Sequence, residues 1–456
     1  MNRKQSALGR RRGTLILALF PLLYFCYVFY IYWTQDIPSS NIEHSGPLNR
    51  PPPDAYRFLN FTQEQCETAF PNLTSDIEAT VSLGPFALKQ AQDTGPLQAR
   101  VKDGQLYILY SEGQGALTPE LLQQRTAALH QIHRAILTSP EPLPDTVFAL
   151  NIRDQPYGTA WSYSRPAYAA SASAMPPISR AFLMPHFSFW SWPLPFIGSV
   201  SRAAAAISRI EGSLPFSQKD PRVVWRGMAR FNGVHNPTLR QDLLSVTAGT
   251  RWADVQALDS YDLESSAQGN MKAATEKGGG SSGSAIMIED FCRYKYVLYT
   301  DGVTYSGRLQ FLQMCRSVLL TPPIAWLQYT THLIRPLFSS DLDLGGKQSW
   351  TQSEGIRKAW PTPYGPGEAN AVFVAPDWSD LEDTVKWLEE HTDVAAGIAT
   401  RQRDLFVEQG YLSPAAEVCY WRALIRGWST VVELEDEGWE DETGISWESF
   451  TMGAKT

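Results

Sequence analysis

The chain has 456 residues, of which 43% are hydrophobic and 19% charged, and its formal net charge is -8. This length holds about two or three domains with buried cores. Because an acidic chain has no general affinity for nucleic acid, any anion site must be local, and nucleic acid is not an expected partner.

The first 56 residues are expected to anchor the chain in a membrane and to space it from the bilayer. Residues 1–12 contain five basic residues and form the expected cytosolic tail, and residues 13–34 are an uncharged apolar run long enough to span a bilayer. A cleaved signal peptide is the alternative, but no small-residue cleavage site follows. The basic flank predicts a single-pass type II protein of the Golgi or endoplasmic reticulum membrane with a lumenal catalytic part. Residues 35–56 contain five prolines and are expected to form a stem.

A lumenal location makes glycosylation and disulfides possible. Asn60 and Asn72 begin N-x-Thr sequons and are candidate glycosylation sites. Of the five cysteines, Cys26 lies in the apolar run, which leaves four for two disulfides.

Element lengths favour one of the possible pairings. The strand predicted from residue 294 advances roughly 23 Å, and the ten-residue helix predicted after it returns about 15 Å. Cys292 and Cys315 are therefore expected to meet, which leaves Cys66 to join Cys419. Four buried free thiols are the alternative.

Hydrophobic periodicity predicts helices and strands in alternation. Residues 119–137 show a broad apolar face at helical spacing. Short apolar runs predict strands at residues 146–152, 222–225, 294–300, 317–321 and 371–374. Residues 260–284 have the composition of a flexible surface insertion, later helices are predicted at 394–408 and 414–427, and the acidic tail after Glu433 is expected to fray. Strands that alternate with helices indicate α/β domains with parallel sheets.

The stretch from Tyr294 to Leu309 reads as a buried strand, a loop of small residues, and an arginine in the first turn of a helix. Loop amides and a helix N-terminus attract anions, and a guanidinium binds phosphate oxygens through two parallel hydrogen bonds. The stretch therefore predicts a phosphate site and a nucleotide-linked substrate. Its expected members are Val303, Thr304, Tyr305, Ser306, Gly307 and Arg308.

Five sets of motifs along residues 60–430 resemble a known family. They are Asn151-Ile152-Arg153-Asp154-Gln155-Pro156; Trp225-Arg226-Gly227 with Arg240-Gln241-Asp242; Cys292-Arg293-Tyr294-Lys295-Tyr296 with Ser306-Gly307-Arg308 and Cys315-Arg316-Ser317-Val318; Asp377-Trp378-Ser379-Asp380-Leu381; and Cys419-Tyr420-Trp421. In this order they resemble the capsule-associated-protein family of glycosyltransferases, glycosyltransferase family 90, which includes fungal capsule xylosyltransferases and animal protein O-glucosyltransferases.

The resemblance implies an α/β fold of GT-B type, with two Rossmann-like domains that face each other across a cleft. Residues 57–205 would form an N-terminal, acceptor-side α/β domain and residues 206–400 the nucleotide-sugar-binding domain. Residues 401–456 would add C-terminal helices and the acidic tail. The resemblance also implies the same two disulfides.

The resemblance assigns roles to individual residues. Asp154, which follows a predicted strand, would be the base of an inverting displacement; a turn-forming Asp is the alternative. Arg308 and Arg240 would bind the donor diphosphate, although an insertion at residues 231–237 makes the match of Arg240 less direct. The remaining donor contacts would be Arg226, Met228, Phe196, Ile197 and Gly198. Surface ion pairs for the arginines and core packing for the aromatic residues are the alternatives.

No metal or cofactor is expected. Asp341 and Asp343 form a DxD pair of the kind that binds a divalent cation, but no clear strand precedes them, and we interpret the segment as a loop. The expected function is metal-independent transfer of xylose or glucose from a UDP-sugar to a hydroxyl of a glycan or protein. The alternatives are a lumenal glycoside hydrolase with two carboxylates and a non-catalytic, membrane-tethered carbohydrate-binding protein.

Overall fold

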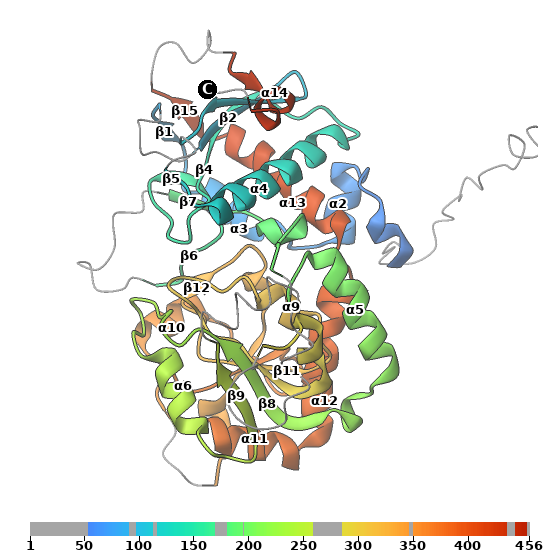
Figure 1. Ribbon diagram of the computed structural model, residues 1–456, viewed down its shortest axis with the longest axis vertical. Coiled ribbons are helices and arrows are strands. Elements are labelled where there is room, and N and C mark those ends of the chain that lie inside the picture. The colour runs from blue at the N-terminus through green and yellow to red at the C-terminus, as the bar shows by residue number, and fades with distance from the viewer. Residues whose placement is uncertain are drawn as a thin grey trace, which may run out of the picture. The chain divides into compact units, whose positions relative to one another are not determined.

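The computed structural model describes residues 53–90, 97–112, 116–168, 180–194, 196–258, 285–345, 350–435 and 443–453. The predicted cytosolic tail, the apolar run and the stem up to residue 52 lie outside these ranges, as does the predicted insertion at 260–284. None of the helices within the described ranges is long and apolar enough to cross a bilayer. The described chain is a mixed α/β fold with two six-stranded sheets, which confirms the predicted class at this level (Figure 1).

The second of these sheets along the chain is parallel throughout, as the alternation of strands and helices predicts. Its spatial order is β13-β14-β11-β10-β8-β9. The chain begins the sheet at β8 and places β9 on one side of it and β10 on the other, so the strand order reverses between β8 and β10. The bounds are β8 Asp220–Gly227, β9 Ala253–Ala257, β10 Tyr294–Leu298, β11 Val318–Thr321, β13 Pro336–Phe338 and β14 Ala371–Phe373.

Both faces of the parallel sheet are buried, because alternate side chains of each strand enter different clusters. On β8, Val223 and Trp225 pack into one apolar cluster, whereas Val224 packs into the other. Helices α6 (Leu239–Thr247), α11 (Leu381–Glu390) and α12 (Thr392–Arg403) supply the first cluster. Helices α5 (Val200–Ser213) and α9 (Leu309–Gln313) supply the second. In Figure 1, α6 and α5 lie on opposite sides of β8.

The first sheet is mixed, which differs from the parallel sheet expected of a Rossmann-like domain. Its order is β16-β3-β2-β4-β5-β7; β16, β3, β2 and β4 pair antiparallel, and β4, β5 and β7 pair parallel. The cause is a hairpin at Asp103 and Gly104, both with positive φ (50° and 70°), as a two-residue type I′ turn requires. The bounds are β2 Leu97–Lys102, β3 Gln105–Tyr110, β4 Thr146–Leu150, β5 Thr159–Ser162, β7 Arg180–Leu183 and β16 Ile445–Ser446.

The C-terminal helices return to the first sheet. Helix α13 (Pro414–Ser429) packs on α4 (Pro119–Leu137), α3 (Ser75–Val81) and α2 (Gln63–Ala69). The disulfide between Cys66 in α2 and Cys419 in α13 fixes this contact, and it is one of the two expected pairs.

The prediction of a frayed tail after Glu433 is wrong for the described part of the tail. Strand β15 (Val432–Leu434) pairs with β1 (Phe86–Leu88), β16 pairs with β3, and α14 (Trp447–Thr451) follows. Trp447 is 3% exposed, so burial of this ring stabilises the end of the chain despite the acidic residues around it. Residues 436–442 lie outside the described ranges.

Helix α9, after the predicted phosphate loop, has five residues rather than ten, and Arg308 is its N-cap. The carbonyl of Leu312 accepts from the amide of Cys315 (3.1 Å), a three-residue step that ends the helix, and the carbonyls of Leu312 and Cys315 also accept from Gln402 Nε2 (3.3 and 3.2 Å). The second expected disulfide, between Cys292 and Cys315, is present at the end of this segment. A single short helix contributes little dipole, so the positive charge near the loop comes mainly from side chains.

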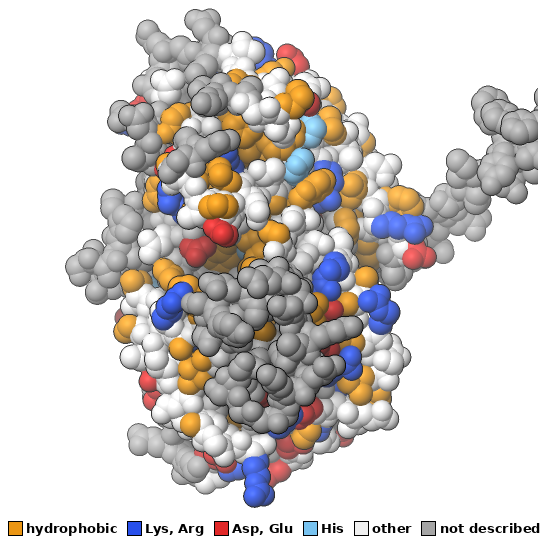
Figure 2. All heavy atoms as spheres, in the orientation of Figure 1, with side chains coloured by type: hydrophobic (Ala, Val, Ile, Leu, Met, Phe, Trp, Pro, Cys, Tyr) orange, Lys and Arg blue, Asp and Glu red, His pale blue; other side chains and the backbone are white. Residues whose placement is uncertain are grey.

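Short elements complete the described chain. Strands β6 (Arg165–Pro166) and β12 (Trp326–Leu327) form an antiparallel pair that links the segment after β5 to the segment after β11. The others are η1 Pro53–Arg57, η2 Phe187–Phe189, η3 Phe216–Gln218, η4 Ile288–Arg293, η5 Thr331–Leu333, η6 Ser339–Asp341, α10 Glu354–Ala359 and a π-helical turn Asp404–Glu408. On the face shown in Figure 2, acidic and basic side chains are interspersed rather than gathered by sign.

Candidate functional site

The candidate site lies where the strand order reverses, at the carboxyl ends of β8 and β10. Open parallel sheets bind ligands outside such a point, because the loops on its two sides diverge. The segment after β8 leads to Arg240, and the segment after β10 contains Asp301 and the loop at residues 302–307.

Arg240 and Arg308 lie around one buried indole, that of Trp225. Their guanidinium carbons are 5.7 and 5.9 Å from the centre of the ring. Arg240 donates from Nε to the carbonyl of Asp301 (3.1 Å) and from Nη1 to the carbonyl of Met228 (3.0 Å). Arg308 donates from Nη1 to the carbonyl of Arg226. Backbone carbonyls at the strand ends therefore orient both guanidinium groups.

These two arginines lack the partners that buried cations usually have. Burial lowers the pKa of Arg240 to about 10, and burial together with the charge of Arg240 lowers the pKa of Arg308 to about 9. Neither forms a salt bridge with any carboxylate in the described ranges. The nearby Asp301 carboxyl raises the pKa of Arg240 but does not offset the effect of burial. Two neighbouring cations without a salt bridge form a site for an anion, because a bound anion removes the unfavourable charge.

The loop at residues 302–307 is held by its own contacts. The amide of Gly302 donates to the carbonyl of Thr304 (2.8 Å), and the amide of Ser306 donates to the hydroxyl of Tyr299 (3.0 Å). A Cβ on Gly307 would lie 2.5 Å from Nε2 of His186, which is buried, so glycine is required there by close approach. The amide of Ser306 is therefore already in use.

Asp154 meets this loop from the other sheet. The Thr304 hydroxyl donates to the backbone carbonyl of Asp154 (2.9 Å). Burial raises the pKa of the Asp154 carboxyl. The pKa values of Tyr163 and Tyr305 are also raised, first by burial of the phenols and second by the charge of Asp154. The side chain remains accessible to solvent, so an incoming hydroxyl can reach it. Asp154 thus lies beside the loop that precedes Arg308.

The turn that carries Asp154 is organised by a buried amide. Asn151 donates from Nδ2 to the carbonyl of Gln155 (2.8 Å) and accepts from the amide of Arg153 at Oδ1 (3.0 Å). These two bonds close the backbone around Asp154 directly after β4. The Asn151 side chain thus supplies the hydrogen bonds that the backbone of this turn would otherwise lack once the strand has ended.

Arg226 and Met228, two other expected donor contacts, meet the paired arginines through their backbone carbonyls, which accept from Arg308 and Arg240. The guanidinium of Arg226 donates to the carboxylate of Asp254 in β9 (2.8 Å), so its charge is neutralised within the sheet. Met228 contributes the carbonyl that orients Arg240.

The segment Phe196 to Gly198 lies against α5 and η4. The Phe196 carbonyl accepts from the amide of Ile288 (2.8 Å), and the Ile197 carbonyl accepts from Arg202 (2.7 Å). Gly198 has a φ of 72° and lies against the Arg202 side chain, which leaves no room for a Cβ. The contacts that hold this segment are thus made with α5 and η4 and not with the paired arginines.

The remaining candidates lie on the surface or in other contacts. The side chains of Asn60 and Asn72 are exposed, and their glycosylation stays a prediction. Asp341 and Asp343 are exposed at the end of η6 and after it. One group of possible metal ligands in the described chain joins Glu211 with Cys292 and Cys315. It is not a metal site, because the two sulfurs form a disulfide and Glu211 pairs with Lys219 (2.8 Å).

Sequence reasoning missed Asp301, which is central to this region. Its carboxylate accepts from the Tyr299 hydroxyl (2.9 Å) and from the Ala325 amide (3.0 Å), and burial raises its pKa to about 7. The signal was available, because Asp301 is an acidic residue directly after a buried strand, the same pattern that singled out Asp154. His186 was missed for another reason: it lies in an aromatic-rich segment that predicts core packing.

The arrangement brings together an anion site and a carboxylate of raised pKa on facing loops. Such a pair suits a reaction in which a hydroxyl loses a proton while a phosphate group departs.

Comparisons with known proteins agree with this chemistry. A family model described as Glycosyl transferase family 90 matches residues 61–339. The chain is 22% identical to Protein O-glucosyltransferase 1 of Homo sapiens over 63% of each chain. It is 20% identical to O-glucosyltransferase rumi of Drosophila melanogaster over 67% of this chain and 65% of the relative. An O-glucosyltransferase rumi homolog of Aedes aegypti is 25% identical over 33% of this chain and 30% of its own length. The match thus spans less than two thirds of these relatives, but more than half of the present chain matches the family model, and the chain belongs to glycosyltransferase family 90.

Proposed function

We propose that the chain is an inverting glycosyltransferase that moves a sugar from a UDP-sugar to a hydroxyl group, with Asp154 as the base. The observation that carries the proposal is the pair of neighbouring guanidinium groups of Arg240 and Arg308, which form no salt bridge in the described chain and lie beside the loop that contacts Asp154.

The chemistry follows from these positions. The acceptor oxygen attacks the anomeric carbon of the donor sugar, and Asp154 takes the hydroxyl proton. The bond from that carbon to the diphosphate breaks, and Arg308 and Arg240 stabilise the charge that develops on the leaving group. One displacement inverts the anomeric centre. Since the two guanidiniums supply the positive charge, we propose that the reaction needs no metal and no cofactor beyond the donor.

The wider context is proposed on the same basis. The two sheets would belong to the two domains of a GT-B enzyme, at residues 57–205 and 206–400, with the donor bound by the parallel sheet. The relatives are named O-glucosyltransferases, which supports glucose as a donor sugar, and xylose is the other candidate. The acceptor would be a glycan or protein hydroxyl in the Golgi or endoplasmic reticulum, reached from a type II anchor at residues 13–34.

The first experiment is a donor panel. The purified protein is incubated with UDP-glucose, UDP-xylose and other UDP-sugars, and UDP release is followed with and without EDTA. We expect slow release with one or two donors and no effect of EDTA. UDP binding is measured in parallel by calorimetry, and failure to bind UDP would remove the proposal.

A matched pair of variants then tests the base. Asp154→Asn should abolish turnover, because the amide cannot accept the proton. It should leave UDP affinity nearly unchanged, because in the proposed mechanism Asp154 does not contact the diphosphate. Asp341→Asn, an exposed acidic residue outside the site, is the control and should retain turnover. If Asp154→Asn instead loses UDP binding, the base is misassigned.

A further inference from the structure

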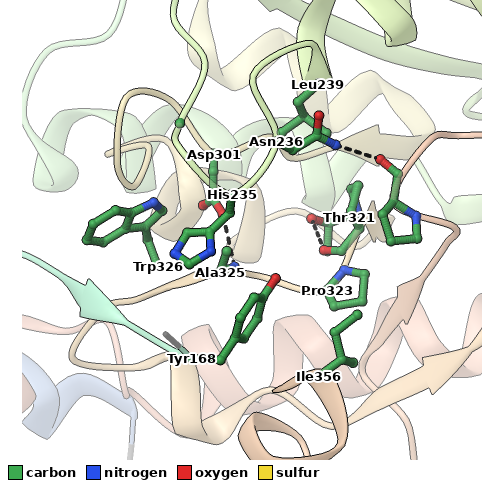
Figure 3. Close-up of a pocket in the computed structure, with 13 residues that line it drawn as sticks. Tyr168, His235, Asn236, Leu239, Asp301, Thr321, Pro323, Ala325, Trp326 and Ile356 are labelled. Atoms are coloured by element: carbon green, nitrogen blue, oxygen red, sulfur yellow. Dashed lines mark hydrogen bonds between the residues drawn. The ribbon is translucent and has the colours of Figure 1, made fainter. Parts of the chain in front are cut away.

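A cavity of about 70 Å³ lies at the carboxyl ends of the parallel strands, where Asp301 after β10 and Thr321 at the end of β11 line it (Figure 3). The segment after β8 closes one side of it through Asn236, whose Nδ2 donates to the carbonyl of Pro376 (2.9 Å). Its apolar floor consists of Leu239, Pro322, Pro323 and Ile356. None of the described residues that line it is Lys or Arg.

Two ring nitrogens at this cavity lack hydrogen-bond partners in the described chain. They are Nε1 of Trp326, a residue that is 1% exposed, and Nε2 of His235. Figure 3 shows both rings at the edge of the same space, and their centres are 5.7 Å apart. An indole N–H that is buried without a partner is unfavourable, so a ligand or water that accepts from it is expected.

The groups on the opposite wall are acceptors or hydroxyls. The Asp301 carboxylate accepts from the Tyr299 hydroxyl and from the backbone amides of Ala325 and Trp326, which leaves one of its about four acceptor positions for a ligand. Tyr168 is 4.9 Å from His235 between ring centres, and burial together with Asp301 raises the pKa of its phenol to about 12, so it stays a hydroxyl. Burial lowers the pKa of His235, so its imidazole is neutral near pH 7 and offers one donor and one acceptor.

This set of groups selects a class of ligand. A phosphate is disfavoured, because a carboxylate and no cation lines the cavity. A pair of adjacent hydroxyls fits, since each hydroxyl both donates and accepts: one accepts from Trp326 Nε1 and donates to Asp301, and the next bonds to His235. The C–H face of a sugar ring packs on aromatic rings and prolines of this kind.

The cavity adjoins the anion site. The carbonyl of Asp301 accepts from Arg240 Nε (3.1 Å), and a Cβ on Gly302 would lie 3.4 Å from Arg240 Nη2. A sugar joined to a diphosphate at Arg240 would therefore reach the cavity without a spacer.

We propose that Asp301, Trp326 and His235 form a subsite for the vicinal diol of a sugar in the donor. The proposal rests on the proposed binding of a UDP-sugar at Arg240 and Arg308. Two parts of the donor carry such a diol, the ribose and the transferred sugar. His235 comes from the segment between β8 and α6, so this segment would complete the donor site.

The test compares ligands that lack one hydroxyl. Calorimetry measures the affinity of the whole protein for UDP, 2′-deoxy-UDP, 3′-deoxy-UDP, UDP-glucose and UDP-xylose. The variants are His235→Phe and Trp326→Phe, which keep an aromatic ring and remove the nitrogens. His391→Phe, an exposed histidine stacked on Trp387, is the control. His235 is only half-buried, so the His235→Phe variant is sufficient for the test if Trp326→Phe does not fold.

If the ribose occupies the subsite, the deoxy ligands should bind the unaltered protein about 10- to 100-fold more weakly, and this difference should shrink to within about 3-fold in both variants. If the transferred sugar occupies it, the variants should bind UDP normally and lose the difference in affinity between UDP and UDP-sugars. Both results support the proposal. Unchanged affinities of the variants for all five ligands would overturn it and leave the proposed function intact. Failure of the unaltered protein to bind UDP would overturn the proposed function and this subsite with it.

Discussion

Replacing Arg308 by methionine should weaken UDP binding and stabilise the protein without ligand. The two effects have opposite signs because the guanidinium is buried beside Arg240 with no carboxylate partner in the described chain. Methionine keeps an unbranched apolar stem against Trp225 and removes the charge.

The magnitudes follow from the surroundings of Arg308. Its pKa of about 9 corresponds to an unfavourable free energy of roughly 5 kcal/mol for the charged form. Lost packing and the bond to the Arg226 carbonyl offset part of the gain, which leaves a net stabilisation of about 1 to 3 kcal/mol. For a chain of this size this raises Tm by about 1 to 4 °C. Loss of a charge-assisted contact to phosphate of about 1.5 to 3 kcal/mol weakens UDP binding about 10- to 150-fold.

Calorimetry gives the affinity, and thermal unfolding without ligand gives Tm. Arg293→Met is the control, because Arg293 is exposed and pairs with Asp290 (2.7 Å), and it should change neither quantity measurably. A variant at Arg308 that lowers Tm and binds UDP as before would refute the reasoning, since Arg308 would then be a structural cation.

Three further predictions follow from the same contacts. Burial raises the pKa of Asp154, and a base acts only when it is deprotonated. Turnover should therefore rise tenfold per pH unit until the pH passes a pKa above the ordinary Asp range, while UDP affinity stays unaltered. A pH–rate profile checks this, and a profile that is flat down to pH 4 contradicts it. Exchange of Cys292 and Cys315 together for serine should lower the free energy of unfolding by about 3 kcal/mol, because their disulfide closes a loop with a sequence separation of 23; denaturant unfolding measures it, and a loss under 0.5 kcal/mol counts against the chain-entropy account. Gly307→Ala should lower both UDP affinity and Tm, because its Cβ would meet His186 at 2.5 Å, and a variant with both values unchanged would show that the loop can move.

Local patterns were sufficient for much of the fold. The helix predicted at 119–137 is present with these bounds, and the five predicted strands are all present, because periodic burial is written into neighbouring residues. The missed hairpin at Asp103 and Gly104 carried a local signal that was not used. The mixed order of the first sheet follows from that hairpin.

The sequence alone therefore determined the α/β class, the strand–loop–arginine motif and the reach that lets Cys292 meet Cys315. Tertiary structure decided which arginine is available to an anion. The resemblance placed both Arg226 and Arg240 among the donor contacts, but β9 brings Asp254 into a salt bridge with Arg226, whereas the guanidinium of Arg240 donates to backbone carbonyls and lies over the Trp225 ring. It also decided that Asp154 lies beside Thr304, 150 positions away. A charge is free or neutralised according to what the fold places against it, and residues far apart in the chain supply those partners.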